Sequence, residues 1–114
     1  MDLVQLLTPE GERLHDDEYD LEVSGEELRG LYRDMVLVRR VDLEAHALQR
    51  QGELGLWPPL LGQEAAQVGS ANAVRLPDYV FPSYREHAIA LHLGVDPVEM
   101  LSTLQTDLRP GAQL

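Results

Sequence analysis

The chain has 114 residues and a formal net charge of −11, with 44% hydrophobic residues, 25% charged residues and no cysteine. This length allows at most one small globular domain, and the missing cysteines exclude a disulfide framework and a thiolate site. The acidic balance argues against nucleic acid as the main partner, because phosphate binding needs clustered basic residues. No apolar run approaches the roughly 20 residues that cross a bilayer, and no signal-peptide pattern opens the chain. We therefore expect a soluble, cytoplasmic protein without a membrane partner.

Residues 1–23 are predicted to form an acidic arm. Half of the acidic residues of the chain lie within its first 27 positions. Thr8-Pro9 and Gly11 interrupt any helix in this stretch. An acidic segment of this kind is either mobile or docked on a partner. We expect the folded part to span residues 24–106 and a flexible tail to occupy residues 107–114.

Residues 24–51 are predicted to form one long helix. Ser24 and Glu27 have the spacing of a capping box, and Gly52 ends the helix. Apolar residues recur along it with helical spacing, at Leu28, Leu31, Met35 and Val38. A second apolar set widens this stripe well past one face: Tyr32, Val36, Leu37, Val41 and Leu43. A helix that is apolar on several sides is expected to contact more than one neighbour.

Residues 52–106 are predicted to contain three shorter helices and one short strand. Pro58-Pro59 makes the connection around Trp57 extended, and a helix of small residues follows from about 61 to 73. Tyr79–Phe81 is expected to be a strand, and Ser83 the N-cap of a helix over 84–93. The last helix is expected over 97–104, with Asp96 as its N-cap and a proline at its first position. The predicted fold class is mainly α with one short strand.

Tyr84 and Arg85 stand side by side between the predicted strand and the following helix. A guanidinium is a rigid fork of donors that matches phosphate oxygens, and the tyrosine hydroxyl adds a donor beside it. A helix start also favours an anion. Two interpretations are open: a phosphate clamp, or an Arg85 paired with a nearby carboxylate beside a packed Tyr84.

Other conventional sites are poorly supported. The four histidines are dispersed, and no HxxxH or HExxH spacing occurs, so we predict no protein-only metal site. No GxGxxG, GxxxxGK or GxSxG motif is present. Glu64 is placed to interact with a helix dipole, and His46 and His92 are interpreted as packed or solvated. His87 could either pack or contact a substrate or a mobile loop.

Taken in order, three segments resemble the alpha subunit of the thiamine diphosphate-dependent first component of 2-oxo acid dehydrogenase complexes. They are LYRDMVLVRRVD, then ALQRQGELGLWPPLLGQEAAQVGSANAV, then DYVFPSYREHAIALHLGVDPVEML. The resemblance runs from about Leu28 to Leu104. It implies the N-terminal part of a thiamine diphosphate-binding α/β fold that lacks most of its parallel sheet.

The resemblance also implies the roles of particular residues. In the family, the Tyr-Arg pair binds the diphosphate, which assigns cofactor binding to Tyr84 and Arg85, with Ser83 beside them. The aromatic segment before GQEA lies near the substrate pocket, which implicates Leu56 and Trp57. His87 is the candidate catalytic residue. The Trp-Pro-Pro version of the segment resembles the branched-chain 2-oxo acid type more than the pyruvate type.

The sequence departs from the family in what it lacks. Relatives continue into a GDG-type motif whose residues hold the magnesium ion on the diphosphate, and this motif is absent here. The carboxylate that activates the aminopyrimidine comes from the beta chain, so Glu64 is not given that role. Three contacts of about 1.5–3 kcal/mol each barely reach the roughly 8 kcal/mol of micromolar affinity. We therefore expect this chain alone to bind the cofactor weakly.

Two functions follow from these observations. In the first, the chain is the N-terminal portion of an alpha subunit that contributes to oxidative decarboxylation of a 2-oxo acid and acyl transfer to lipoyl. Its partners would be the beta subunit and the lipoyl-bearing second component, within an oligomer. In the second, the chain is a truncated, non-catalytic remnant or a helical interaction module. Helices that lack the sheet they normally cover are expected to expose apolar surface.

Overall fold

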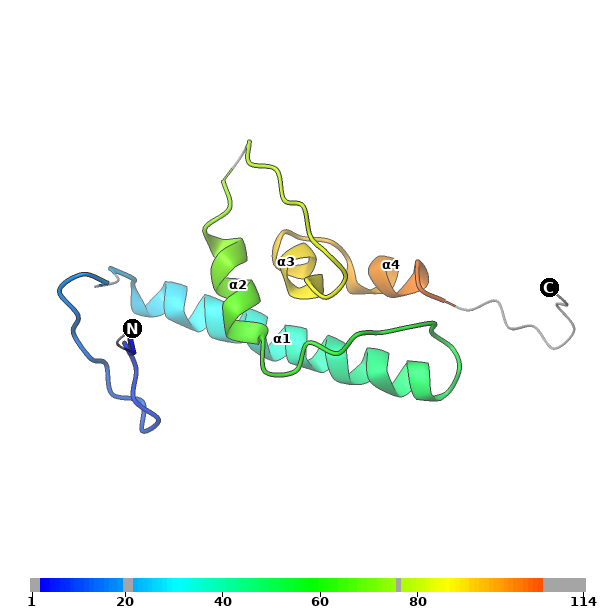
Figure 1. Cartoon of the computed structure of the whole chain (residues 1–114), viewed down its shortest axis with the longest axis horizontal. Coiled ribbons are helices and arrows are strands. Elements are labelled where there is room, and N and C mark those ends of the chain that lie inside the picture. The colour runs from blue at the N-terminus through cyan, green and yellow to red at the C-terminus, as the bar shows by residue number, and fades with distance from the viewer. Residues whose placement is uncertain (1–2, 20–21, 76, 106–114) are drawn as a thin grey trace, which may run out of the picture.

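The computed structural model describes residues 3–19, 22–75 and 77–105, and within them the fold is helical. Four helices follow one another: α1 (Gly25–Arg50), α2 (Glu64–Asn72), α3 (His87–His92) and α4 (Pro97–Ser102). Figure 1 shows α1 as a long rod, with the three shorter helices arranged along one side of it. The prediction of a mainly α fold is confirmed.

The capping box sets the start of α1 as the sequence predicts. The Ser24 hydroxyl oxygen accepts the Glu27 N–H at 3.2 Å, and the Glu27 carboxylate accepts the Ser24 N–H at 2.7 Å. The backbone and side-chain hydrogen bonds from Ser24 lower the pKa of the Glu27 carboxyl. Gly52 adopts a φ of +81° directly after the helix, a conformation that glycine tolerates best.

One face of α1 carries the core. Val38, Val41 and Ala45 are buried on this face, at spacings of three and four residues. A first cluster packs around Val38 and Val41 with side chains from α2, α3 and the connection before α2: Leu60, Val68, Ala88 and Leu91. A second cluster packs around Ala45 and includes Leu54, Trp57 and residues of α4. The two clusters hold α2 and α3 near the middle of α1 and α4 near its end.

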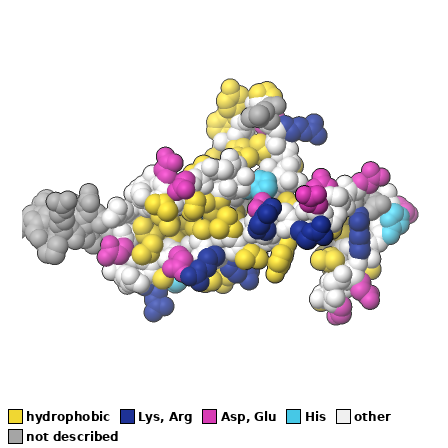
Figure 2. All heavy atoms as spheres, turned by 180° about the vertical axis from the view of Figure 1, so that it is seen from behind, with side chains coloured by type: hydrophobic (Ala, Val, Ile, Leu, Met, Phe, Trp, Pro, Cys, Tyr) yellow, Lys and Arg dark blue, Asp and Glu magenta, His cyan; other side chains and the backbone are white. Residues whose placement is uncertain are grey.

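A second apolar face of α1 is exposed. Tyr32, Val36 and Leu43 lie on this face, and each keeps 51–65% of its surface accessible. Leu37 is 48% exposed on another side of α1. Apolar side chains also project at the tip of the segment between α2 and α3, where Tyr79 is 86% and Phe81 90% exposed. Figure 2 shows this tip as a protruding hydrophobic group at the top of the molecule. The predicted exposure of apolar surface is therefore observed.

The predicted strand and the start of the following helix are wrong. Tyr79–Phe81 forms no strand, because a strand requires a paired neighbour and the pairings among the described residues are two isolated bridges elsewhere. The helix predicted over 84–93 is limited to His87–His92, and its N-cap is Glu86 in place of Ser83. Ser83 instead directs its N–H and hydroxyl to the Glu86 carboxylate.

The last two helix ends are close to the predicted positions. Asp96 caps α4 by accepting the N–H groups of Val98 and Glu99, with Pro97 at the first helical position. α4 ends at Ser102, two residues before the predicted end. The predicted flexible tail at 107–114 lies outside the described residues.

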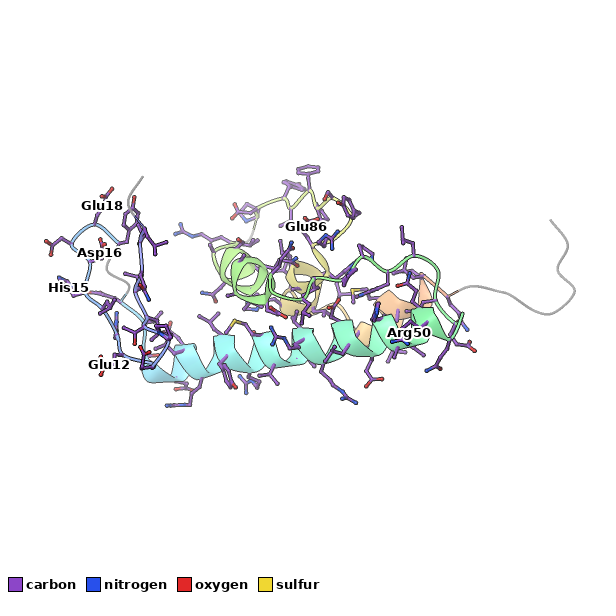
Figure 3. All side chains as sticks on the ribbon, turned by 60° about the horizontal axis from the view of Figure 1, so that its bottom comes forward. Glu12, His15, Asp16, Glu18, Arg50 and Glu86 are labelled. Atoms are coloured by element: carbon purple, nitrogen blue, oxygen red, sulfur yellow. The ribbon has the colours of Figure 1, made fainter. Side chains whose placement is uncertain are left out.

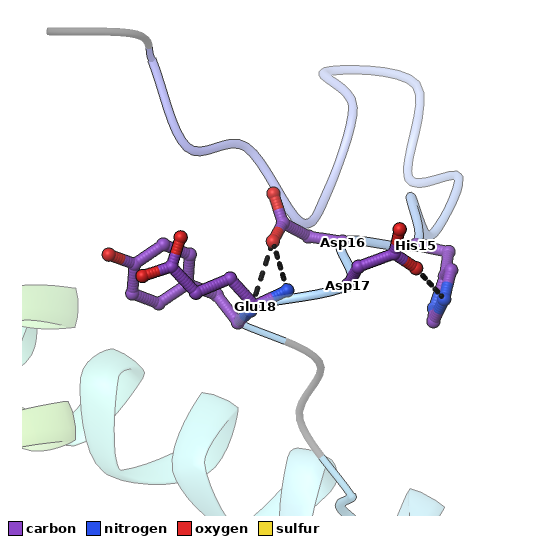
Figure 4. Close-up of polar contacts among 5 residues, drawn as sticks. His15, Asp16, Asp17 and Glu18 are labelled. Atoms are coloured by element: carbon purple, nitrogen blue, oxygen red, sulfur yellow. Dashed lines mark hydrogen bonds and ion pairs between the residues drawn. The ribbon is translucent and has the colours of Figure 1, made fainter.

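The described part of the N-terminal arm is organised by local turns. Leu7 and Arg13 form an antiparallel bridge around a turn in which Gly11 has a φ of +89°. The Asp16 carboxylate accepts the N–H groups of Glu18 and Tyr19, both at 2.9 Å (Figure 4). Whether the arm docks on a partner stays a prediction. Along the described ranges, no helix combines the length and apolarity needed to cross a membrane.

Candidate functional site

Two connections meet above the middle of α1 and build the candidate site. The first contains Trp57 and precedes α2, and the second contains the predicted contact residues and precedes α3. The Trp57 and His87 rings stack with their centroids 4.1 Å apart and their planes inclined by 18°. Figure 3 places Glu86 on the second connection, well away from the labelled residues of the N-terminal arm. The stack of Trp57 on His87 joins the first connection to the first residue of α3.

Asp42 on α1 fixes the first connection. One of its carboxylate oxygens accepts the Trp57 indole N–H at 2.8 Å and the Leu60 backbone N–H at 3.0 Å. Asp42 is 2% exposed and Trp57 is 1% exposed. A buried carboxylate is tolerated where hydrogen bonds satisfy it, and the Trp57 and Leu60 N–H groups provide these bonds. Asp42 therefore holds the Trp57 ring in the orientation that stacks on His87.

The predicted diphosphate contacts lie at the end of the second connection, just before α3. Tyr84 is 67% exposed, and the Arg85 guanidinium carbon lies 5.4 Å from the centre of its ring. A guanidinium nitrogen of Arg85 donates to the Pro59 carbonyl oxygen of the first connection. A guanidinium has five N–H donors, and this contact uses one of them. Tyr84 and Arg85 thus lie together at the surface, with Arg85 anchored across the site.

The backbone around Ser83 already holds an anion, which is the Glu86 carboxylate. It accepts the Ser83 N–H at 2.7 Å, the Arg85 N–H at 3.3 Å and the Ser83 hydroxyl at 3.1 Å. Burial raises the pKa of Glu86, but the hydrogen bonds from Ser83 and Arg85 outweigh it, so that the pKa lies below its usual value. The donors at Ser83 and Arg85 therefore converge where a negatively charged oxygen can sit.

His87 has a half-buried imidazole. Burial lowers its pKa below the usual value of 6.5, although the negative charges of Asp42 and Glu86 oppose the shift. Its Nε2 atom is buried and has no hydrogen-bond partner within the described part of the chain. A neutral imidazole near the contact residues can accept or donate a proton, as the candidate catalytic role requires. The stack on Trp57 satisfies the alternative interpretation of packing equally well.

Arg85 borders a cavity of about 430 Å³, whose other lining residues come from α1 and the first connection: Asp42, Leu43, His46, Pro59 and Leu61. Leu56 is 80% exposed, whereas Trp57 belongs to the core. The cavity does not bring Leu56 and Trp57 together as a lining. His46 is exposed at its border, and His92 lies elsewhere, with its Nδ1 atom 2.8 Å from Asp34.

Glu64, at the start of α2, forms an ion pair that joins α2 to α1. Its carboxylate lies 2.8 Å from the Arg39 Nε atom and accepts the Gly62 N–H at 3.0 Å. The hydrogen bond from Arg39 is the main cause that lowers the pKa of Glu64 to about 2, against the opposing effect of burial. Glu64 therefore joins the start of α2 to α1, and its exclusion from activation of the cofactor stays a prediction.

Asp42 and Gln67 are functional candidates that the sequence-based prediction missed. Both are buried and polar, and both hold the backbone of a connection. A signal was available for Asp42, because it lies four residues after Val38 and three before Ala45 on the buried face. Gln67 likewise stands three residues after Glu64 and directly before Val68. A polar residue within a helical apolar stripe indicates such a role.

Comparisons with known proteins agree with the motifs. Residues 32–113 match the family model described as "Dehydrogenase E1 component". The chain is 47% identical over 94 residues to the 3-methyl-2-oxobutanoate dehydrogenase subunit alpha of Mycobacterium tuberculosis, covering 82% of this chain and 26% of that protein. It is 37% identical over 83 residues to the pyruvate dehydrogenase E1 component subunit alpha of Bacillus cereus, covering 73% of this chain and 22% of that protein.

The corresponding subunit of Staphylococcus aureus is 36% identical over 85 residues, which is 75% of this chain and 23% of that protein. The chain belongs to the Dehydrogenase E1 component family, among the alpha subunits of 2-oxo acid dehydrogenases. The predicted family is therefore confirmed. The chain spans about a quarter of the length of the curated relatives that it matches.

Proposed function

We propose that this chain supplies the diphosphate contacts of thiamine diphosphate in a 2-oxo acid dehydrogenase, through Tyr84 and Arg85 with Ser83 beside them. The observation that carries the proposal is the convergence of donors at this point. The Ser83 and Arg85 amides already hold a carboxylate, and Arg85 lies at the border of a cavity. Charge-assisted hydrogen bonds from such donors suit phosphate oxygens.

The donor set fits a diphosphate, with one condition. Glu86 occupies the amides of Ser83 and Arg85, so its carboxylate must turn away before phosphate oxygens can use them. Tyr84 and the remaining guanidinium donors of Arg85 need no such change. Among the described residues, no three acidic or histidine side chains converge to hold a metal ion. The family resemblance assigns the magnesium ligands to a GDG-type motif that this sequence lacks, so affinity in this chain alone is expected to be weak.

The roles of the other site residues follow from their positions. Thiamine diphosphate, when bound, supplies the chemistry that removes the carboxylate of a 2-oxo acid. His87, kept neutral by burial, would hold or transfer a proton near the pocket. Trp57 orients His87 by stacking, and the exposed Leu56 would lie at the entrance to the substrate pocket.

The complete activity that we propose is oxidative decarboxylation of a 2-oxo acid with acyl transfer to a lipoyl group. A branched-chain 2-oxo acid is favoured over pyruvate, because the identity to the 3-methyl-2-oxobutanoate relative is 47% and to the pyruvate relatives 36–37%. The relatives are named as alpha subunits, which supports a beta subunit as a partner. A lipoyl-bearing second component is proposed as a further partner from the family resemblance alone.

A second candidate function is that of a non-catalytic helical interaction module. The exposed apolar face of α1, formed by Tyr32, Val36 and Leu43, favours this alternative. An exposed patch of this kind marks a protein interaction surface. The same face is compatible with a subunit contact in the first proposal, so binding of the cofactor separates the two.

Calorimetric titration with thiamine diphosphate and Mg²⁺ tests the proposal. We expect weak binding by the wild-type chain, in the millimolar range near −4 kcal/mol, and its loss in Arg85→Ala. Arg40→Ala is the matched control, because Arg40 pairs with Glu44 on the exposed side of α1. Equal affinity of wild type and Arg85→Ala would contradict the proposal and favour the interaction module.

A further inference from the structure

Gln67 on α2 makes hydrogen bonds to the residues that flank Glu86 and His87, which are Arg85 and Ala88. Its Nε2 atom donates to the Arg85 carbonyl oxygen at 3.1 Å, and its Oε1 atom accepts the Ala88 N–H at 3.1 Å. A further bond joins Nε2 to the Gln63 side chain at 3.1 Å. Gln67 is 6% exposed and Ala88 is completely buried. One carboxamide therefore fixes a backbone group at the end of the second connection and one in the first turn of α3.

α3 depends on this contact for its first turn. α1 and α4 have N-cap side chains of their own, from Ser24 and Asp96. α3 has none, because the side chain of its N-cap residue Glu86 turns back to Ser83 and Arg85. The Ala88 N–H belongs to the second helical residue, one of the groups that a capping side chain normally satisfies. Gln67 supplies the missing acceptor from a neighbouring helix.

We propose that Gln67 is a positioning residue, which holds the Tyr84–Arg85 pair in place by fixing the Arg85 carbonyl oxygen and the Ala88 N–H to α2. This inference rests on the proposed function, since the pair is positioned for binding a diphosphate. α2 is itself joined to α1 by the ion pair of Glu64 with Arg39. Arg85 is thereby fixed from two sides: its carbonyl oxygen by Gln67, and its guanidinium by Pro59.

Loss of the carboxamide would leave both backbone groups without this partner. Ala88 is completely buried, and a buried N–H without an acceptor is strongly unfavourable, so the start of α3 would shift or open. A displacement on the order of 1 Å is enough to misplace donors that must act together on one ligand. The effect of Gln67 on binding is thus transmitted through the backbone of Arg85.

The test compares Gln67→Met with Gln63→Met in the full chain. Gln63 is exposed, lies one turn earlier and bonds only to Gln67 among the contacts described above. In Gln67→Met we expect the hydrogen exchange of the Ala88 amide to accelerate about tenfold. The affinity for inorganic pyrophosphate should fall about 5–10-fold. The amide resonances of Tyr84 and Arg85 should shift without ligand. Gln63→Met should change none of these quantities.

Gln67→Glu separates capping from positioning. A glutamate keeps an acceptor for the Ala88 N–H but loses the donor to the Arg85 carbonyl oxygen. We expect Ala88 protection to return and pyrophosphate affinity to stay low, with Gln63→Glu as the control for the added charge. If Gln67→Met does not fold, this variant decides the question through the same resonances and affinities.

Two results would overturn the inference: unchanged Tyr84 and Arg85 resonances in Gln67→Met, or wild-type pyrophosphate affinity in both Gln67 variants. Failure of the proposed function has a different signature. In that case Arg85→Ala binds pyrophosphate as the wild type does, whereas the resonances of the Gln67 variants still decide whether the residue positions the pair.

Discussion

Two parts of the site differ in how much of their structure this chain supplies. The inner part consists of three buried residues, Asp42, Trp57 and Gln67. Asp42 accepts the Trp57 indole N–H, and Gln67 donates to the Arg85 carbonyl oxygen. The outer part consists of the segment from Tyr79 to Tyr84, whose aromatic side chains are 67–90% exposed. The inner part is complete in itself, and the outer part presents side chains toward a ligand or a partner. Substitutions in the first should change stability, and at Gln67 also binding through the backbone of Arg85. Those in the second should change binding with little effect on stability.

The largest effect is expected from Trp57→Ala. The indole is buried in the second cluster and covers His87, so truncation should lower the free energy of unfolding by about 3–5 kcal/mol. Denaturant unfolding followed by circular dichroism measures this change. Trp57→Phe keeps most of the volume and loses the bond to Asp42, and should lower stability by about 1–2 kcal/mol. A loss below 1 kcal/mol in Trp57→Ala would remove the distinction between the inner and outer parts.

A smaller effect is expected from Glu64→Gln, and it depends on pH. The pKa of Glu64 is about 2 in the folded chain, below the usual 4.5, so its contribution is fully present above pH 4.5 and disappears as pH falls through 2. At pH 7 the variant should be less stable by about 1–2 kcal/mol, because Arg39 is half exposed and the pair is partly screened.

Thermal unfolding of wild type and Glu64→Gln between pH 7 and pH 2 checks this sign. The two proteins should converge at the acid end of the range. Glu44→Gln is the control, since Glu44 forms an exposed pair with Arg40, and it should change stability by less than about 0.5 kcal/mol. A difference that stays constant with pH would show that the Arg39–Glu64 pair does not stabilise the fold.

The state of His87 can be followed through Trp57, which is the only tryptophan of the chain. Protonated imidazole stacked on an indole quenches its fluorescence, so emission should fall as His87 gains a proton. Because burial lowers the pKa of His87, the midpoint should lie below 6.5. His87→Gln should abolish the transition, and His46→Gln should leave it unchanged. A midpoint at or above 6.5 would show that burial is not the dominant influence on the pKa of His87.

The smallest effect on stability is expected from Phe81→Ser in the outer part. Phe81 is 90% exposed, so the free energy of unfolding should change by no more than about 0.5 kcal/mol. Self-association, measured by sedimentation velocity, should decrease because an apolar side chain is removed from the surface. Destabilisation of more than 1 kcal/mol would show that the outer part contributes to the fold.

The sequence predicts the helices where local signals suffice. The capping box at Ser24, the glycine at 52 and the Asp96-Pro97 pair set helix ends through neighbouring residues, and they are found as predicted. The start of α3 could not be predicted in this way. Its acceptor comes from Gln67, 21 positions earlier in the chain, and the local Ser83 pattern is diverted to Glu86. Tyr79–Phe81 has strand-forming residues but no neighbouring strand among the described residues.

The candidate site was predictable to the same limited extent. The Tyr84–Arg85 pair could be identified from its motif and from donor chemistry. The buried roles of Asp42 and Gln67 depend on which helix face meets which connection, and this is decided by packing. The bond from the Ser83 amide to the Glu86 carboxylate follows the same three-residue spacing as the capping box of Ser24 and Glu27, a signal that the sequence-based prediction did not use. The bond from the Arg85 amide to the same carboxylate is a consequence of the turn.

The most direct test of the diphosphate site is amide chemical-shift mapping of the full chain with thiamine diphosphate and Mg²⁺. Thiamine, which lacks both phosphates, is the matched ligand control. We expect thiamine diphosphate at millimolar concentration to shift the amides of Ser83 to Ala88 most strongly. Thiamine should not shift them, and Arg85→Ala should abolish the response. Equal shifts with both ligands, or the largest shifts outside this segment, would contradict the assignment of the diphosphate to Tyr84 and Arg85.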